Sequence, residues 1–177
     1  MRILGIDPGF ERLGIAVLEK LPPQKPFDRA QGKAPFAQGY GGPREQVLFS
    51  ECFKTSAKLE FSERLKLIGE EVRKIIKEYK PEVLSIETLF LTTNHKTVMR
   101  VAEARGVVIY EASRANLKIF EASPPQIKIA ITGYGKSDKA QMIKMVKMLV
   151  KIDESKKSDD ELDAVAIALT ALAHSRF

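Results

Sequence analysis

The spacing of hydrophobic positions along the chain predicts five strands. Apolar runs at residues 3–6 and 13–18 flank a Pro8-Gly9 turn, and residues 47–53 make a third run. Two more short apolar runs lie at residues 83–86 and 117–120. Runs of this length that are bounded by turn residues are typical of strands buried in a sheet.

Helical spacing of apolar residues predicts helices between and after these strands. Residues 62–79, 95–113 and 138–151 carry apolar side chains every three or four positions. Pro124-Pro125 opens a short helix, and a strongly apolar last helix is expected over residues 159–173. Three early strands, followed by helices that alternate with two more strands, predict an α/β fold with a mixed five-stranded sheet flanked by helices.

Residues 21–46 differ in composition from the rest of the chain. They hold five of the nine prolines and four of the eleven glycines, with a net charge of +2. Such a segment cannot form a continuous helix or a central strand. We interpret it as a long exposed loop inserted in one domain that spans residues 1–177, because this length fits a single core.

Overall composition narrows the classes of protein that fit. The 177 residues are 44% hydrophobic and 29% charged, as in ordinary globular proteins. The single cysteine, Cys52, cannot form an internal disulfide, and two histidines are a poor basis for a zinc site. No apolar run has the length of a membrane span or of a signal peptide, so we expect no membrane partner and a cytoplasmic location. The formal charge of +6 and the pI of 9.4 are compatible with a polyanionic partner.

Two carboxylates follow apolar strands directly. Asp7 comes after residues 3–6 and Glu87 after residues 83–86, so both lie at the carboxyl ends of predicted strands, where sites in α/β proteins form. Each also has a purely structural reading. Asp7 before Pro8-Gly9 can initiate a turn, and Glu87 taken alone fits a solvated strand end.

Two more carboxylates lie on the predicted last helix. Asp160 and Asp163 are three residues apart and therefore share a face. Ser158 and Glu161 have the spacing of a capping box, and acids in the first turn favour the helix dipole. These local effects account for Glu161 and extend to Asp160. They do not account for Asp163, which lies past the first turn beside the buried stripe.

Acids from two strands and one helix can converge on one metal site. Hard divalent ions such as Mg²⁺ take oxygen ligands and are held by few carboxylates plus substrate phosphate. Two such ions about 3.5–4 Å apart can clamp the attacking and leaving oxygens of an in-line phosphoryl displacement. The chemistry predicted for the four acids is therefore phosphoryl transfer or hydrolysis.

Five motifs in sequence order extend this interpretation. They are Ile3-Leu4-Gly5-Ile6-Asp7-Pro8-Gly9; Ile86-Glu87-Thr88-Leu89-Phe90 with Asn94; Ala104-Arg105-Gly106-Val107; Gln126-Ile127-Lys128 followed by Gly133-Tyr134-Gly135 and Lys139; and Asp160-Glu161-Leu162-Asp163-Ala164. Together they resemble the RuvC family of Holliday junction resolvases, within the ribonuclease H-like superfamily. The resemblance runs from residue 1 to about residue 175, and residues 21–46 depart from it.

The resemblance implies a ribonuclease H-like fold and a metal-dependent endonuclease that resolves Holliday junctions by paired symmetric nicks in recombination and DNA repair. Asp7, Glu87, Asp160 and Asp163 would be the catalytic residues and would hold two Mg²⁺ ions, for which Mn²⁺ would substitute. One ion would activate the attacking water and the other would stabilise the leaving 3′ oxygen. Glu161 is the alternative to Asp160 in this ligand set.

The resemblance also implies which residues contact DNA. Lys128 and Lys139 would touch backbone phosphate near the cut, and Phe90 would stack or wedge at the junction crossover. Read locally, the two lysines fit a solvated helix flank and Phe90 fits a core position. The complete set of expected DNA contacts is Phe90, Asn94, Lys96, Lys128, Tyr134 and Lys139.

Expected partners follow from the symmetry of the substrate. A four-way junction is nearly two-fold symmetric and paired nicks need two active sites, so we expect a homodimer. Residues 95–113 are the expected interface, where Gly106 would permit close backbone contact. Branch-migration machinery is a further expected partner. Residues 21–46 would be an added junction contact or, as we favour, a surface loop.

Three alternatives remain beside this interpretation. One is a related nuclease of the same superfamily that acts on RNA or on other branched nucleic acid. The second is a junction-binding protein without catalysis. The third is the actin-like group of sugar kinases and ATPases, but these need two such domains and 177 residues are too few. The chain also lacks the Gly-x-x-x-x-Gly-Lys-Ser/Thr loop of other nucleotide-binding proteins.

Overall fold

The computed structural model describes residues 1–21, 45–89, 95–152 and 157–174, and these contain one six-stranded sheet in the order β5-β4-β1-β2-β3-β6. β1 (Arg2–Asp7) lies inside the sheet, between antiparallel β2 (Arg12–Lys20) and parallel β4 (Val83–Glu87). β3 (Glu45–Lys54) is antiparallel to β2, and β5 (Lys118–Ala122) is parallel to β4. The short strand β6 (Val150–Lys151) is parallel to β3.

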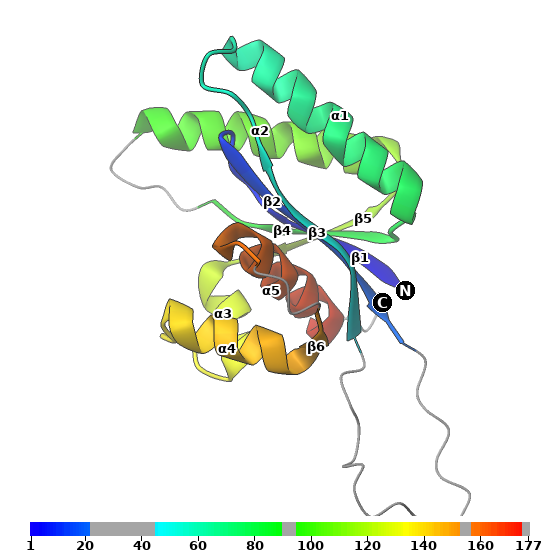
Figure 1. The fold of residues 1–177 in the computed structure, drawn as a ribbon, viewed down its shortest axis with the longest axis vertical. Helices are drawn as coiled ribbons and strands as arrows, with labels where there is room; N and C mark the ends of the chain where they lie inside the picture. Colours follow the sequence, from blue (N-terminus) through cyan, green and yellow to red (C-terminus); the bar gives the residue numbers. More distant parts are fainter. Residues whose placement is uncertain (22–44, 90–94, 153–156, 175–177) are drawn as a thin grey trace, which may run out of the picture.

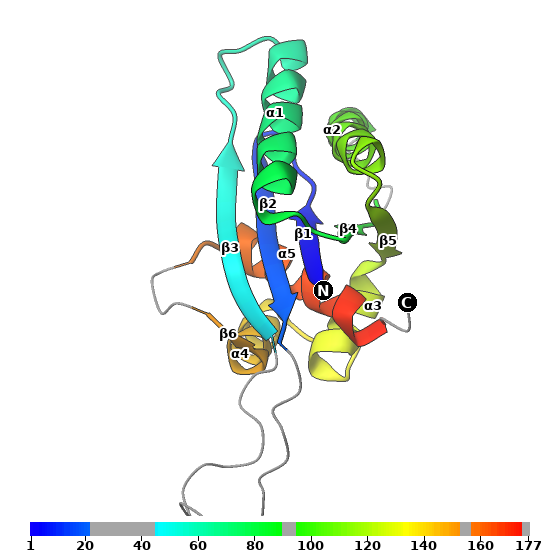
Figure 2. The same ribbon diagram turned by 90° about the vertical axis from the view of Figure 1, so that its right-hand side faces the viewer.

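Helices cover both faces of this sheet. α1 (Phe61–Tyr79) and α2 (His95–Arg114) lie on one face, and α3 (Pro124–Thr132), α4 (Lys139–Leu149) and α5 (Asp159–His174) lie on the other (Figure 1). Figure 2 shows the same two layers of helices with the strands between them. The predicted α/β architecture with a mixed sheet is confirmed. Within the described residues, no helix is long and apolar enough to cross a membrane.

The alternation of side chains along the strands separates two hydrophobic clusters. Leu4 and Ile6 of β1 belong to the cluster that includes residues of α1 and α2, whereas Ile3 belongs to the cluster built around α5. Successive residues of a strand point to opposite faces. Asp7 therefore points to the same face as Ile3, toward α5. In β4, Glu87 follows Val83 and Ser85 to that face, where the Ser85 hydroxyl donates to the Ile167 carbonyl at 2.7 Å.

Two predicted boundaries are wrong. The sheet has six strands and not five, because the helix expected over residues 138–151 ends at Leu149 and residues 150–151 form β6. Val150 has extended backbone and is 2% exposed, so leaving the helix buries its side chain against the cluster around α5.

The partners of β6 are residues that we expected in a loop. Glu45 and Gln46 pair with Val150 and Lys151, and both also continue the ladder between β3 and β2. Backbone pairing on both sides overrides the loop-like composition that precedes them, so the strand begins two residues earlier than predicted. The rest of the predicted loop, residues 22–44, lies outside the described residues.

Candidate active site

The register of β1 and β4 brings the first two predicted acids together. The two strands are parallel, and Ile6 pairs with Ile86, so Asp7 and Glu87 end neighbouring strands at the same edge of the sheet. Both point toward α5 for the reason given above. The carboxyl ends of parallel strands thus supply half of the candidate site, as predicted.

Two glycines allow α5 to lie close enough to the sheet to supply the other half. A Cβ at Gly5 would collide with the Ala164 carbonyl and the Ala168 side chain, and a Cβ at Gly14 would collide with the Asp160 carbonyl. Gly14 is also the cross-strand partner of Asp7. The absence of side chains at both positions lets the first turns of α5 pack directly on the backbone of β1 and β2.

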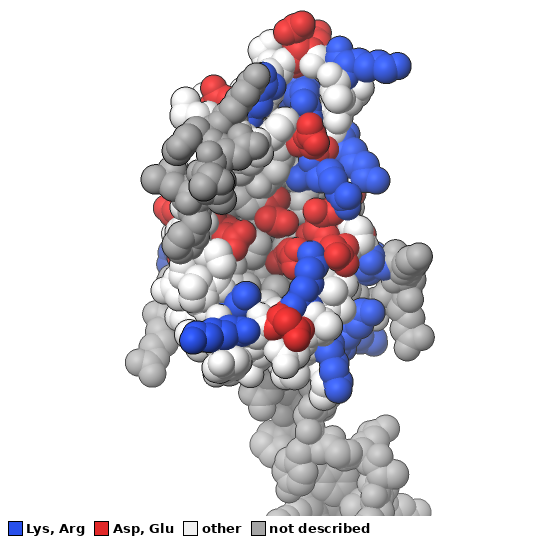
Figure 3. All heavy atoms as spheres, turned by 90° about the vertical axis from the view of Figure 1, so that its left-hand side faces the viewer, with Lys and Arg blue, Asp and Glu red and all other residues white. Residues whose placement is uncertain are grey.

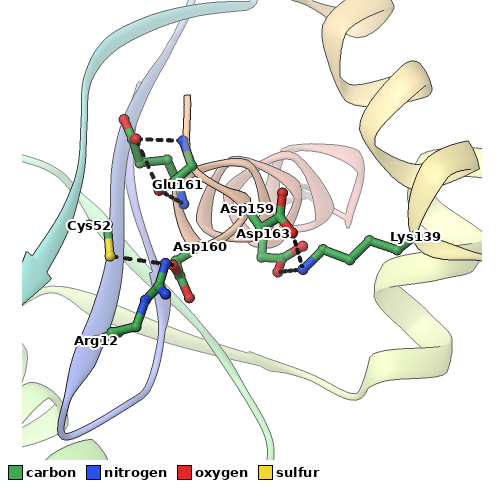
Figure 4. A network of polar contacts seen from close by, with 8 residues as sticks. Arg12, Cys52, Lys139, Asp159, Asp160, Glu161 and Asp163 are labelled. Carbon is green, nitrogen blue, oxygen red and sulfur yellow. Dashed lines mark hydrogen bonds and ion pairs between the residues drawn. The ribbon is translucent and has the colours of Figure 1, made fainter. Parts of the chain in front are cut away.

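The two helix acids project from α5 toward different cations (Figure 4). Asp160 forms an ion pair with the Arg12 guanidinium and accepts a hydrogen bond from the Cys52 thiol at 3.3 Å. Asp163 accepts from Lys139 Nζ at 3.1 Å, and the same amine lies 3.3 Å from the Asp159 carboxylate. Arg12 is on β2 and Lys139 on α4, so each helix acid is tied to a different neighbouring element.

A pocket of about 230 Å³ lies at the carboxyl ends of β1 and β4, and residues of α3, α4 and α5 complete its lining. Its acidic lining consists of Asp7, Glu87 and Asp163, and its basic lining of Lys128 and Lys139. Figure 3 shows acidic side chains gathered in the middle of this face of the molecule, with lysine and arginine side chains on more than one side of them. The fold has therefore assembled three of the four predicted acids in one pocket.

Burial and neighbouring negative charges both raise the pKa values of Asp7 and Glu87. Burial, together with the negative charges of Asp163 and Asp160, raises the pKa of Asp7 to about 6. Burial and the charges of Asp7 and Asp163 raise the pKa of Glu87 to about 7. Asp160 thus belongs electrostatically to the same cluster, although it does not line the pocket. Such a cluster stores repulsion that a bound cation relieves.

Hydrogen bonds and ion pairs shift the pKa values of Asp160 and of the Lys139 amine. Partial burial raises the pKa of Asp160, but hydrogen bonds from Cys52 and Arg12 outweigh it, so the pKa is lowered overall. Lys139 is the cation nearest to Asp163. Partial burial lowers the pKa of that amine, and its contacts with Asp163 and Asp159 outweigh the burial and raise it.

Glu161, the alternative to Asp160, is occupied by structural bonds. Its carboxylate accepts from the Ser158 backbone amide at 2.9 Å, the Ser158 hydroxyl at 3.0 Å and the Ser50 hydroxyl at 2.9 Å. The Ser158 hydroxyl in turn accepts from the Glu161 amide at 3.3 Å. The predicted capping box is confirmed. It directs Glu161 toward β3 and away from the pocket.

The donor set suits a hard divalent cation. All candidate ligands are carboxylate oxygens, which Mg²⁺ and Mn²⁺ prefer, and the described residues that line the pocket include no histidine or cysteine. In the side-chain positions described, no three His, Cys, Asp or Glu residues are arranged to hold a metal ion together. In this arrangement the Asp160 carboxylate is paired with Arg12 and the Asp163 carboxylate with Lys139.

The predicted DNA contacts divide into three groups. Lys128 and Lys139 line the pocket, and Tyr134 is 60% exposed in the loop after α3. Lys96 lies in the first turn of α2, and its side chain is not among those described. Phe90 and Asn94 lie outside the described residues.

Sequence reasoning did not find three residues of the site. Arg12, Cys52 and Asp159 all contact one of the predicted residues or its cation. Arg12 could have been predicted from the sequence. It follows Asp7 by five residues, across the turn, and a cation so close in sequence to a predicted metal ligand must lie near the site. Cys52 carried no signal, since only the pairing of β3 with β2, in which Cys52 faces Gly14, brings it to Asp160.

Comparisons with known proteins point to one family. The sequence model described as "Crossover junction endodeoxyribonuclease RuvC" matches residues 38–171. A protein of that name from Thermosipho melanesiensis is 39% identical over 177 residues, which cover all of both chains. Another, from Finegoldia magna, is 37% identical over the whole of this chain and 96% of its own.

A solved structure shows the same fold. The structure described as "T. thermophilus RuvC in complex with Holliday junction substrate" superposes with a TM-score of 0.82 at 27% identity, over 99% of this chain and 95% of the other. The ribonuclease H-like fold expected from the motifs is therefore confirmed. The sequence match over the full chain and the shared fold lead to one conclusion: this chain belongs to the RuvC family of crossover junction endodeoxyribonucleases.

Proposed function

We propose that this protein is a divalent-metal-dependent, structure-selective endonuclease that resolves Holliday junctions by paired symmetric nicks, in homologous recombination and DNA repair. One observation carries the proposal: Asp7, Glu87 and Asp163 come from three separate elements and line one pocket beside Lys128 and Lys139. The names of its relatives, and a neighbour solved with a Holliday junction substrate, support the choice of substrate.

The metal requirement is the first part of this proposal. Nucleases of this family depend on divalent metal ions. We assign two Mg²⁺ ions per site to Asp7, Glu87, Asp160 and Asp163, with Mn²⁺ as a substitute. When bound, such ions activate the attacking water and stabilise the leaving 3′ oxygen, which yields 5′-phosphate products. The raised pKa values of Asp7 and Glu87 support this role, because they arise from burial and from neighbouring negative charges, and a divalent cation in the pocket would favour the ionised carboxylates against both.

The chain's own residues bind and orient the nucleic acid. Lys128 and Lys139 lie on the α3–α4 side of the acids, where an ammonium can hold a backbone phosphate and neutralise developing charge. Tyr134 exposes a ring in the adjoining loop that can stack on a base. We retain Phe90 as a wedge at the crossover and Asn94 and Lys96 as further DNA contacts. Phe90 and Asn94 belong to the segment between β4 and α2, and Lys96 to the first turn of α2.

A homodimer through α2 is the second part of the proposal. Met99, Ala102, Gly106 and Tyr110 are all exposed and recur at helical spacing, so they form one face of α2. Apart from its chain neighbours and the adjacent backbone of α2, no atom of the described residues lies within 4 Å of a Cβ added at Gly106. This open face, with a glycine at its centre, suits the close approach of a second copy.

The dimer can be tested by light scattering. The protein should have the mass of a dimer at micromolar concentration, and Gly106→Glu should reduce it to a monomer because two like charges would meet near the two-fold axis. Lys66→Glu, on the exposed side of α1, is the charge control. A wild-type monomer that still makes paired incisions would contradict this part of the proposal. Branch-migration machinery as a partner and a cytoplasmic location complete the proposal.

Cleavage of a mobile synthetic four-way junction tests the function directly. With Mg²⁺ we expect symmetric nicks whose ends can be ligated, and with EDTA no cleavage. Asp7→Asn and Asp163→Asn should reduce cleavage at least about 1,000-fold while junction binding survives, because both residues hold metal. Glu161→Gln is the matched control, since Glu161 caps α5 and does not line the pocket. Near-normal cutting by both aspartate variants would disprove the site assignment.

A further inference from the structure

We propose that Arg12 is a phosphate-binding residue that is exchanged between two anions: it pairs with Asp160 in the metal-free protein and with the nucleic-acid backbone once a divalent ion binds Asp160. This inference rests on the proposed function, because it takes Asp160 as a metal ligand and nucleic acid as the substrate. It assigns a binding role to a residue that neither the motifs nor the pocket lining includes.

The position of Arg12 places a cation at the edge of the acidic cluster. Arg12 is the first residue of β2, five residues after Asp7, and its guanidinium pairs with Asp160 Oδ2 (Figure 4). The same oxygen accepts from the Cys52 thiol. The Arg12 side chain is 54% exposed, whereas that of Asp160 is 23% exposed. The arginine therefore covers the carboxylate from the solvent side and remains accessible itself.

A metal ion at Asp160 would weaken this pair. A divalent ion on either carboxylate oxygen puts two positive charges next to the guanidinium, and like charges a few ångströms apart repel even where solvent screens them. Guanidinium and metal thus compete for one carboxylate. Cys52, a neutral donor, does not face this repulsion and can continue to orient Asp160.

A released Arg12 is well suited to bind phosphate. The planar guanidinium can donate two parallel hydrogen bonds to a phosphate, and its exposure means that little desolvation is needed. The cross-strand partner of Arg12 is Lys54, which lines a shallow hollow between β3 and the start of α5 together with Glu51, Glu161 and Lys157. Lys157 is paired with Glu161 at 3.5 Å, so Arg12 and Lys54 form the basic flank on the β2–β3 side of the acids.

This basic flank lies across the acidic cluster from Lys128 and Lys139. A nucleic-acid strand whose scissile phosphate sits over the acids would meet Lys128 and Lys139 on one side and Arg12 on the other. Before metal binds, Arg12 is neutralised by Asp160 and holds phosphate poorly. Strong binding of the nucleic-acid backbone on the β2–β3 side therefore requires a divalent ion at Asp160, which releases Arg12.

The first experiment measures metal affinity without nucleic acid or cleavage. The Mg²⁺ and Ca²⁺ concentrations that give half-maximal thermal stabilisation are compared for wild type, Arg12→Gln, Arg12→Lys and Arg2→Gln. Arg12→Gln should lower both midpoints about three- to tenfold, because the competing cation is gone. Arg12→Lys should stay near wild type. Arg2→Gln is the matched control. Arg2 of β1 also forms an ion pair, with Glu19 of β2 at 3.0 Å, but this pair lies at the end of the two strands opposite to Asp7 and Arg12.

The second experiment measures junction affinity by fluorescence anisotropy, in EDTA and in Ca²⁺, with a gel to verify that the junction stays intact. Arg12→Gln should bind like wild type in EDTA and about three- to tenfold more weakly in Ca²⁺. In Ca²⁺, but not in EDTA, the slope of log K against log [salt] should be shallower for Arg12→Gln than for wild type, by the amount expected for about one phosphate contact. Arg12→Lys should keep most of the affinity, and Arg2→Gln all of it.

Other results overturn the inference. Equal losses in EDTA and Ca²⁺ would mean that Arg12 contacts DNA without exchange, and no loss in either would leave it a fixed counter-ion of Asp160. Unchanged metal midpoints for Arg12→Gln would also overturn it. Failure of the proposed function is seen separately, as the absence of metal-dependent nicks by the wild type.

Discussion

At the scale of single residues, the four acids divide into two that form ion pairs and two that form none with the described residues. Asp160 and Asp163 pair with Arg12 and Lys139. Asp7 and Glu87 are partly buried beside other carboxylates, and the charge of Lys139 offsets only part of the resulting rise in the pKa of Asp7. The second pair therefore bears most of the repulsion in the metal-free site. Its effect on the stability of the protein can be measured through pH.

Asp7 should destabilise the metal-free protein at neutral and higher pH. Its folded pKa, about 6, lies above the ordinary value of 3.8, so between these values the folded protein holds the proton that the unfolded chain has lost. The free energy of unfolding therefore falls as pH rises from about 4 to about 6, and it stays lower above that range. Glu87 acts in the same sense, from its ordinary value of 4.5 to about 7.

Asp7→Asn should consequently stabilise the metal-free protein at pH 8. We expect a gain of about 1–2 kcal/mol, which corresponds to roughly 2–8 °C in Tm, and little gain at pH 4, where Asp7 is protonated. Thermal unfolding in EDTA at both pH values measures it. Glu121→Gln, at an acid outside the pocket, is the control. A lower Tm than wild type at pH 8 would show that the Asp7 carboxylate is not under repulsion.

At the scale of elements, the placement of α5 on the sheet decides the geometry of the site. The apolar character of residues 164–173 predicted a buried helix, and residues 164–172 are buried. Sequence spacing could not show which strands it crosses. The two close approaches, Gly5 against Ala164 and Gly14 against Asp160, set that contact and with it the distance from the helix acids to Asp7.

Gly14→Ala should therefore disturb both stability and the site. The added methyl group meets the Asp160 carbonyl, so α5 must shift away from β2. Overpacking of this kind costs about 1–3 kcal/mol, and we expect a matching loss in urea unfolding together with weaker stabilisation by Mg²⁺. Gly106→Ala adds the same methyl group where the subunit leaves open space and should not destabilise the subunit. Equal stability of Gly14→Ala and wild type would argue against the close contact.

At the scale of the whole molecule, the modest net charge is the sum of an acidic cluster and a strongly basic remainder. The four acids contribute −4 to the formal charge of +6, so the rest of the chain carries +10. Acidic side chains gather in the middle of one face, with basic side chains on more than one side of them (Figure 3). Such a surface attracts the DNA backbone through counterion release, while the acidic centre repels it until divalent ions bind.

Junction affinity should depend both on the repulsion by the acidic cluster and on the attraction by the basic surface. In EDTA, the double variant Asp7→Asn/Asp163→Asn should bind a four-way junction several-fold more tightly than wild type, and Ca²⁺ should close this gap by neutralising the wild-type acids. For both proteins, log K should fall steeply with log [salt], with a slope of about −4 to −5 if some five phosphates are contacted. Anisotropy titrations from 50 to 300 mM NaCl check both. Weaker binding by the double variant in EDTA would mean that the acids do not repel DNA.

The sequence by itself determined the class of fold, the order of the elements and the identity of the acids, because hydrophobic period and the carboxyl ends of strands are local properties. Asp7 and Glu87 could be selected because they follow apolar strands, and Asp163 because no cap explains it. The sequence left open whether Asp160 or Glu161 belongs to the site. The structure distinguishes them, because hydrogen bonds from Ser50 and Ser158 hold the Glu161 carboxylate away from the pocket.

Only the tertiary structure decided which groups meet. Residues 150–151 form a strand because β3 offers an open edge, which no helical spacing could reveal. Arg12, Cys52 and Lys139 reach the acids from three elements that are far apart in the sequence. Ion pairs depend on distances of a few ångströms between side chains, and those distances are set by packing: by the glycines under α5 and by the register of β1 with β2 and β4.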